Sequence, residues 1–405
     1  MTLGQALRLG PIMLGLAACL GSGQALAAKA YDPGVTDREI KLGQTMPYSG
    51  PLSAYGTIGK ATAAYFAKIN ADGGVNGRKI TLVSLDDSYS PPKTVEQTRK
   101  LVEDEGVFLL FESLGTPTNV AVQKYLNAAK VPQLFLQSGA NRWNDPKTYP
   151  WSIPGLPGYG AEARIYAKYV LANKPAAKIA VLYQNDDFGK DFLKGFRDGL
   201  GAEADRMIVA SQTYETTDPS VDSQIIALAG SGADTFFSMS LQRQTSQGIR
   251  KASEVNWHPL HFIPLVSNSL RTVLTPAGVE RAAGIVSTSI YKDPSDPKWQ
   301  SDAEYQAWLD WMKRYYPEGS TVESLNVAAY TEAALMVEVL RRCGDELTRE
   351  NAIRQATSLR DLKLPMLLPG ISVTVTPDDY SPFRNFQMIR FDGSQWVPLG
   401  APVGG

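Results

Sequence analysis

Histidine and cysteine are scarce in this chain, which has only two of each in 405 residues. His258 and His261 are separated by a Pro-Leu pair, and the proline breaks any helix that would present them to one metal ion. We therefore expect structural roles for both at the start of a strand, and no metal site. A Ser-His-Asp triad would need one of them, yet the nearest approach to a G-x-S-x-G motif, Phe111 to Gly115, begins with Phe. The sequence predicts a protein that is not an enzyme, with a secreted hydrolase as the minor alternative.

An excess of one charge is also missing. The chain has 40 Lys plus Arg against 41 Asp plus Glu, so it has no basic surplus with which to bind a nucleic acid. Nucleotide motifs fail as well: Gly56 to Ala61 has two residues instead of four between its glycines, and it ends in Ala where a P-loop has Ser or Thr. Gly199 to Ala204 follows a predicted helix instead of a strand. We expect no cofactor.

Long hydrophobic runs are absent after residue 30. Before it, one cation (Arg8), an apolar stretch over 9–20 and the triplet Ala25-Leu26-Ala27 are typical of a secretory signal peptide covering 1–27, which predicts export to the periplasm. A competing interpretation is a lipobox ending in Cys19, which would then carry lipid. If Cys19 leaves with the signal, Cys343 has no partner for an intramolecular disulfide.

From residue 32 onward, short apolar runs alternate with longer amphipathic stretches, which is the βαβ pattern of a parallel sheet. Two breaks divide the pattern: the Pro/Gly-rich stretch 149–158 and the turn-rich stretch 292–297. The expected strands are 40–46, 80–86, 108–111, 133–136, 178–183, 207–214, 235–239, 260–265, 284–290, 371–375 and 386–391, the last closing on an Asp-Gly turn. The expected helices are 58–70, 94–105, 161–172, 188–200, 221–229, 244–255, 299–316, 324–342 and 348–357.

Small and hydroxyl-bearing residues follow two neighbouring strands of this predicted sheet. One loop runs from Ser113 to Asn119 before a helix expected at Val120, and the other contains Gln137 to Ala140. Loops at the carboxyl ends of parallel strands lead into helix N-termini, whose free N–H groups favour anions. The two loops therefore predict a carboxylate site. Aromatic residues near other strand ends offer walls for an apolar ligand; they are Tyr48, Tyr55, Tyr159, Phe188 and Tyr291.

The order of several motifs along the chain resembles periplasmic solute-binding proteins of the leucine/isoleucine/valine-binding type. The matching pieces are 37–43, 49–56, 69–80, Asp86-Asp87, 114–119, 185–189 and 391–393. The resemblance implies an α/β fold of two Rossmann-like lobes with parallel central sheets, joined by a three-crossing hinge. It implies lobe 1 over 31–152 plus 286–372 and lobe 2 over 153–285 plus 373–405. It also implies a monomer that hands a small molecule to an ABC permease in the inner membrane; a ligand sensor for a membrane receptor is the alternative.

The resemblance also transfers a ligand site. Carboxylate contacts are expected from the two loops, at Ser113, Leu114, Gly115, Thr116, Ser138, Gly139 and Ala140; Tyr55, Phe188, Leu241 and Ser267 are expected around the ligand body. Family members that bind amino acids place an acid after strand 260–265 to pair with the ammonium group, but Val266-Ser267-Asn268 stands there. A buried ammonium without an anion is costly. Either Asp186 or Asp187 substitutes, or the ligand is an aromatic or aliphatic organic acid without an amine.

Overall fold

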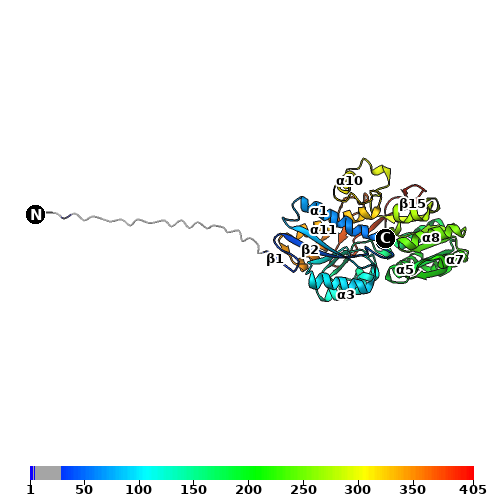
Figure 1. Cartoon of the computed structure of the whole chain (residues 1–405), viewed down its shortest axis with the longest axis horizontal. Helices are drawn as coiled ribbons and strands as arrows, with labels where there is room; N and C mark the ends of the chain where they lie inside the picture. The colour runs from blue at the N-terminus through cyan, green and yellow to red at the C-terminus, as the bar shows by residue number, and fades with distance from the viewer. Residues whose placement is uncertain (3, 5–28) are drawn as a thin grey trace.

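A computed structural model describes residues 1, 2, 4 and 29–405 (Figure 1). The predicted signal peptide therefore lies, apart from three residues, outside the described part of the chain, and so does Cys19. Two α/β lobes lie side by side, with the helices α1, α3 and α11 around one sheet and α5, α7 and α8 around the other (Figure 1).

Lobe 1 is built on a five-stranded parallel sheet with the strand order β3-β2-β4-β5-β6. Its strands are β2 (Glu39–Met46), β3 (Lys79–Asp86), β4 (Leu109–Phe111), β5 (Gln133–Leu136) and β6 (Ser152–Pro154). Its helices are α1 (Thr57–Ala71), α2 (Pro91–Arg99), α3 (Thr116–Ala128), α10 (Ala303–Tyr315), α11 (Ser324–Cys343) and α12 (Arg349–Ala356). Two small ladders complete it: β1 (Ala30–Tyr31) with β12 (Glu346–Leu347), and β13 (Leu359–Leu362) with β14 (Val373–Val375).

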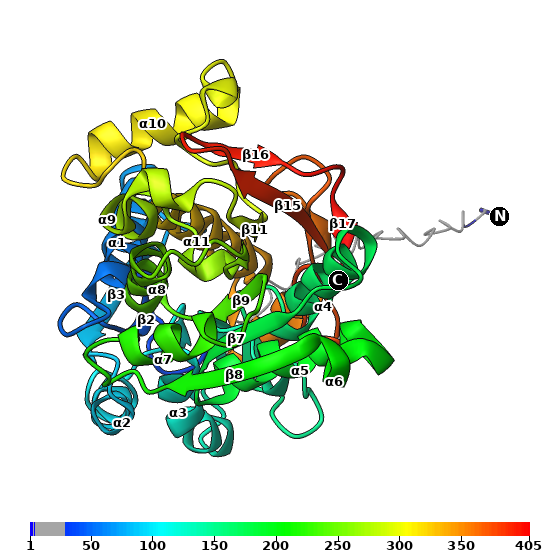
Figure 2. The same ribbon diagram turned by 90° about the vertical axis from the view of Figure 1, so that its right-hand side faces the viewer.

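Lobe 2 has a larger sheet with the order β16-β15-β11-β10-β9-β7-β8, in which β15 is antiparallel to both its neighbours (Figure 2). Its strands are β7 (Ile179–Gln184), β8 (Ile208–Tyr214), β9 (Thr235–Met239), β10 (Leu260–Phe262), β11 (Val286–Ser289), β15 (Asn385–Phe391), β16 (Trp396–Pro398) and β17 (Val403–Gly404), which pairs with β15. Its helices are α4 (Tyr159–Asn173), α5 (Asp187–Leu200), α6 (Ala204–Met207), α7 (Asp222–Ala229), α8 (Gln242–Glu254) and α9 (Thr275–Ala277).

The fold class predicted from the sequence is confirmed, whereas the strand pairing moves the lobe boundaries. The first crossing follows β6, which pairs with β5, so it comes after residue 154 instead of 152. The prediction put residue 286 in lobe 1, but β11 hydrogen-bonds with β10 and β15 of lobe 2, so the second crossing comes after residue 289. The third comes after β14, because a break at 372 would separate β14 from β13. Sequence alone could not reveal these pairings, because the apolar runs on either side of each crossing look alike.

Two helices begin three or four residues earlier than predicted. The stretch 94–105 forms α2 from Pro91 followed by a π-turn over Lys100–Asp104, because proline is well accommodated in the first turn of a helix. The helix expected at Val120 begins at Thr116, again with a proline in its first turn. This second difference places Thr116, a predicted ligand contact, within the first turn of α3.

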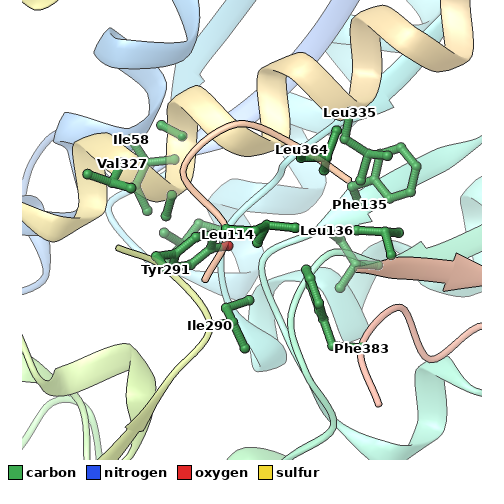
Figure 3. Close-up of a cluster of buried hydrophobic side chains, with 14 of the residues drawn as sticks. Ile58, Leu114, Phe135, Leu136, Ile290, Tyr291, Val327, Leu335, Leu364 and Phe383 are labelled. Carbon is green, nitrogen blue, oxygen red and sulfur yellow. The ribbon is translucent and has the colours of Figure 1, made fainter. Parts of the chain in front are cut away.

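Apolar side chains from both sides of the crossings pack into one buried cluster (Figure 3). Phe135 and Leu136 of β5, Tyr291 after β11, Leu335 of α11 and Phe383 before β15 all belong to it. Each buried side chain of this size stabilises the fold by roughly 1.5–3 kcal/mol. The cluster therefore fixes the crossing segments and, with them, the position of Tyr291.

Within residues 29–405, every helix falls short of the length or the apolar content that a membrane crossing would require. Cys343 lies buried on α11 as a free thiol, and burial raises its pKa to about 12. Such a thiol is protonated and shielded at neutral pH, so it acts as a small apolar residue.

Candidate ligand site between the lobes

A cavity with a void of about 1090 Å³, including its open mouth, lies between the two lobes. Aromatic side chains from both lobes form much of its wall: Tyr55, Tyr89, Tyr159, Phe188, Tyr291, Trp299 and Trp396. Aliphatic residues such as Ile58, Leu241 and Leu325 fill the spaces between them. A concave, mainly apolar cavity with a few polar groups is the usual form of a small-molecule site.

The predicted site residues divide into two groups. Six of the predicted positions line the cavity: Tyr55, Leu114, Gly115, Thr116, Phe188 and Leu241. Five lie behind the wall, buried in their own lobe: Ser113, Ser138, Gly139, Ala140 and Ser267. Of the five aromatic candidates, Tyr48 is also outside the cavity, because its hydroxyl contacts Ser84 of lobe 1 at 2.6 Å.

Gly115 needs to be glycine at this position. Its φ of +104° is rarely adopted by other residues, and a Cβ there would lie 2.4 Å from the Tyr89 ring and 2.5 Å from the Thr118 hydroxyl. Tyr89 itself has a φ of +58°, so its backbone is strained to turn the ring onto this loop. The absence of a side chain at Gly115 therefore lets Tyr89 form part of the cavity wall.

Thr116 offers the cavity the hydrogen-bond donors of a helix N-terminus. Its backbone N–H, in the first turn of α3, has no protein acceptor among the described residues. Its hydroxyl lies 2.6 Å from the Ser138 hydroxyl, which in turn accepts a hydrogen bond from the Trp143 indole at 2.8 Å. Ser138 thus orients Thr116 from behind. Because the partial positive charge of the helix dipole adds to these donors, an anion is favoured here.

Tyr159, the first residue of α4, brings a hydroxyl to the same place. Burial raises its pKa to about 12, although the Gly139 N–H and the hydroxyls of Ser138 and Thr116 surround the phenol oxygen and act in the opposite direction. The donors of the second predicted loop therefore converge on Tyr159 instead of the cavity. Tyr159 lines the cavity in their place.

The remaining predicted residues have structural partners. The Ser113 hydroxyl accepts a hydrogen bond from the Thr45 N–H at 3.2 Å, and the Ser267 hydroxyl donates to the Ser240 carbonyl at 2.7 Å. A Cβ on Gly139 would lie 1.9 Å from the Pro157 carbonyl oxygen, so only glycine allows the two chain segments to approach. Ala140 is buried beside them and its N–H faces the Ser138 hydroxyl at 3.3 Å.

Direct contacts hold the lobes together around the cavity. The Tyr55 hydroxyl, from lobe 1, donates to the Val266 carbonyl at 3.1 Å and accepts from the Gln242 N–H at 3.3 Å, both in lobe 2. On another side, the Ser269 hydroxyl of lobe 2 donates to the Glu323 carboxylate of lobe 1 at 3.1 Å. The structure thus has the lobes closed on one another.

Neither candidate for an ammonium partner is available to a ligand. Asp187 forms an ion pair of 2.7 Å with Arg142 across the lobe interface, outside the cavity. Asp186 caps α5, where it accepts from the Gly189 N–H at 3.3 Å and from the Gln184 amide, and burial raises its pKa. Two other acids, Asp293 and Asp296, line the cavity near Trp299. Asp293 accepts a hydrogen bond from the Ser295 N–H, and Asp296 forms an ion pair of 2.6 Å with Lys298.

A pair of buried carboxyl groups supports the cavity wall from behind. Glu332 of α11 accepts hydrogen bonds from Gln137 and from the Tyr291 hydroxyl at 3.0 Å, and both of these residues line the cavity. Burial raises the pKa of Glu332 to about 8. Burial, and then the charge of Glu332, raise the pKa of Glu112 well above its usual value. Both carboxyl groups therefore keep their protons to a higher pH than an exposed glutamate does.

Several cavity residues escaped the sequence analysis. Tyr89 lies two residues after the Asp86-Asp87 pair, and its place in the cavity wall depends on its positive φ, which the sequence does not predict. Trp299 follows the second crossing, and Trp396 lies on the β15–β16 hairpin. These residues are brought to the cavity by the crossings, so a signal confined to strand ends could not find them.

The two histidines lie away from the cavity. His261 on β10 is buried and stacked on Phe236 with ring centroids 4.4 Å apart, and burial lowers its pKa to about 3. It is therefore neutral, as suits a core residue at the start of a strand. His258 is exposed and contacts the Asn256 side chain at 3.1 Å.

Two α/β lobes with three crossings and an enclosed aromatic cavity define a bilobal ligand-binding protein. The chain matches the periplasmic binding protein family over residues 39–395, and it belongs to that family. This membership confirms the predicted family resemblance and the expectation of a binding protein instead of an enzyme.

Comparisons with individual proteins agree with this assignment. A Leu/Ile/Val-binding protein homolog 7 of Brucella abortus is 28% identical over 250 residues, which cover 58% of this chain and 61% of that relative. The chain thus matches about three fifths of the length of that relative. A Thermus thermophilus branched-chain amino acid ABC transporter structure with bound valine superposes with a TM-score of 0.81 at 16% identity, covering 92% of this chain and 98% of that one. A fatty acid ABC transporter substrate-binding protein from Thermomonospora curvata gives 0.76 at 21% identity, covering 93% and 95%.

Proposed function

We propose that this protein is the periplasmic solute-binding component of an ABC importer, and that its ligand is a small, largely apolar carboxylate without an amine. The observation that carries the proposal is the cavity lining: the wall is aromatic and aliphatic, and its two acids already have protein partners. An amino acid would bring an ammonium group into this cavity, where Asp296 is already paired with Lys298 and burial raises the pKa of Asp293, so the desolvation cost of the ammonium group is poorly offset. An amine-free acid avoids that cost.

The relatives support an apolar ligand body. The Brucella protein is named for leucine, isoleucine and valine, the Thermus structure contains valine, and the Thermomonospora protein is described as binding fatty acid. The ligands in these names share a carboxylate and a hydrocarbon part, and they differ in the amine. The lining of this cavity favours the amine-free side of that division.

In this proposal the ligand carboxylate lies at the N-terminus of α3. There the Thr116 N–H and hydroxyl and the Tyr159 hydroxyl provide donors, and the helix dipole adds partial positive charge. Phe188 and Leu241 of lobe 2 and Leu114 of lobe 1 then flank the hydrocarbon body. A ligand that contacts both lobes stabilises the closed arrangement relative to the open one, and the permease recognises that arrangement. The protein acts as a monomer in this scheme.

The test uses ligand pairs that differ only in the amine. Purified protein beginning at Ala28 is heated with 4-methylpentanoate or leucine, and with 3-phenylpropanoate or phenylalanine. A ligand at 100 times its dissociation constant stabilises the native state by about 2.7 kcal/mol, so the melting temperature rises by several degrees. We expect shifts with the two amine-free acids only. A shift with leucine or phenylalanine alone would refute the amine-free assignment.

A variant tests the position of the carboxylate. Thr116→Val removes a hydroxyl that donates to a charged group, which is expected to weaken 4-methylpentanoate binding about tenfold or more. Thr98→Val is the matched control, because Thr98 is buried in α2, away from the cavity, and its hydroxyl has no hydrogen-bond partner in the described structure. Equal affinities for the two variants would remove Thr116 from the site.

A further inference from the structure

A second cavity adjoins the ligand site on the other side of Tyr55. It lies between the loop Pro51 to Tyr55 of lobe 1 and the side of α8 in lobe 2, with Thr272 and Pro276 completing the wall. Its void is about 680 Å³ and opens to solvent. Figure 2 shows α8 and α9 packed together, and residues of both line this outer cavity. Tyr55 lines both cavities, so its side chain is the partition between them.

The outer cavity is polar and positively charged, unlike the inner one. Arg243 and Arg250 line it, and no acid does so among the described residues. Arg243 has no carboxylate within ion-pair distance in the described structure, and it donates only to the Pro219 carbonyl at 2.8 Å. Arg250 has a single long contact of 3.8 Å with Glu254, both of them exposed. A guanidinium without a close anionic partner has donors left for a ligand.

Unsatisfied polar atoms gather at the same place. Gln242 is only 2% exposed, and both ends of its side-chain amide lack hydrogen-bond partners among the described residues. The Gln247 amide oxygen and the Thr272 hydroxyl also lack hydrogen-bond partners among the described residues. All three residues line the outer cavity. Buried polar groups are nearly always hydrogen-bonded, so such a cluster around a void indicates that something polar occupies it.

We propose that the outer cavity is a second binding site for carboxylates, in which the solute is held by Arg243, Arg250 and the Gln242 amide before it passes Tyr55 into the inner cavity. The class of ligand rests on the proposed function. The partition supports the path, because the Tyr55 hydroxyl is hydrogen-bonded to the Gln242 N–H and the Val266 carbonyl of lobe 2, and both contacts break when the lobes part. The two arginines attract the carboxylate while it passes Tyr55 in either direction, so they lower one barrier that entry and exit share.

This shared barrier gives the proposal a kinetic signature. In the double variant Arg243→Gln/Arg250→Gln, the association and dissociation rate constants for 4-methylpentanoate are expected to fall together, by about fivefold to tenfold, with an unchanged Kd. Stopped-flow tryptophan fluorescence follows the binding, since Trp299 and Trp396 line the inner cavity. Lys313→Gln/Arg314→Gln on the exposed side of α10 is the control with the same charge change. Unchanged rates, or a weaker Kd with faster dissociation, would overturn the proposal.

A second measurement does not depend on the inner site. Trifluoroacetate is a carboxylate too small to need the apolar cavity, and its fluorine NMR line broadens when it exchanges with a bound state. We expect equal broadening with the wild type and with Lys313→Gln/Arg314→Gln, and weaker broadening with Arg243→Gln/Arg250→Gln, in which only the inner carboxylate site remains. Equal broadening in all three proteins would mean that trifluoroacetate binds away from the two arginines, which would overturn the proposal. Failure of 4-methylpentanoate to bind the wild type would instead contradict the proposed function.

Discussion

Replacing Tyr55 by phenylalanine separates lobe closure from ligand contact. The substitution keeps the ring in the cavity wall and removes one hydroxyl, which in the closed structure donates to the Val266 carbonyl and accepts from the Gln242 N–H. In the open state water hydrates all three groups, so the loss is confined to the closed state. Each of the two backbone groups left unpaired costs about 1 kcal/mol or more, which gives about 2 kcal/mol for the pair. That cost corresponds to a ligand affinity weaker by roughly thirtyfold.

Isothermal titration with 4-methylpentanoate measures this difference directly. Tyr48→Phe is the matched control, since the Tyr48 hydroxyl contacts Ser84 within lobe 1 and plays no part in closure. We expect the control to keep the affinity of the wild type, and Tyr55→Phe to leave the ligand-free melting temperature much less affected than the affinity. An affinity within twofold of the wild type in Tyr55→Phe would refute the reasoning, because the hydroxyl would then contribute nothing to the closed state.

Three further variants test the site. Gly115→Ala places a Cβ 2.4 Å from the Tyr89 ring, so this variant should lose about 2 kcal/mol of stability and most ligand binding. Its control is Gly73→Ala, which has a similar φ of +100° but open space around the Cβ, and which should lose about 1 kcal/mol of stability and no binding. Denaturant unfolding measures the stability of both variants, and titration measures their ligand affinity. Arg142→Gln removes a half-exposed interlobe ion pair worth at most about 1 kcal/mol, so Kd should rise no more than about fivefold, and less at high salt. Glu332→Gln should flatten the pH dependence of stability. The pKa of Glu332 is about 8 in the folded state and 4.5 ordinarily, so between these pH values the folded state holds a proton that the unfolded state has lost, and the wild type loses up to about 1.4 kcal/mol of stability per pH unit as the pH rises. Chemical unfolding of both proteins across that pH range measures the difference.

The sheets were predictable from the sequence because buried parallel strands form apolar runs with little interruption. Each of the eleven predicted strand ranges contains a strand, and the alternation with amphipathic helices fixed the fold class. The lobe boundaries were less accessible. Whether β11 joins the first or the second sheet depends on its partners β10 and β15, and the β15 partner comes about a hundred residues later. No local pattern carries that information.

Part of the predicted site lines the cavity and part lies behind its wall, for a physical reason. Loops after parallel strands do converge, and Gly115 and Thr116 reach the cavity as expected. Sequence reasoning could not tell which hydroxyls of such a loop face outward. Ser138 lies behind Thr116 and bonds to Trp143, while Tyr159 takes the position that the second loop was expected to fill. A hydroxyl in a buried loop is as useful for holding the loop as for holding a ligand.

Closure in this protein does not depend on the ligand alone. Tyr55 with Val266, Ser269 with Glu323, and Arg142 with Asp187 join the lobes at separate points, and none of these contacts needs a ligand atom. A ligand shifts the balance between open and closed only by the difference in its affinity for the two states. Because the lobes already attract one another, a small apolar ligand with few polar groups is sufficient to stabilise the closed state. Because these contacts contribute to the stability of the closed state, substitutions at them should alter Kd even where they do not touch the ligand.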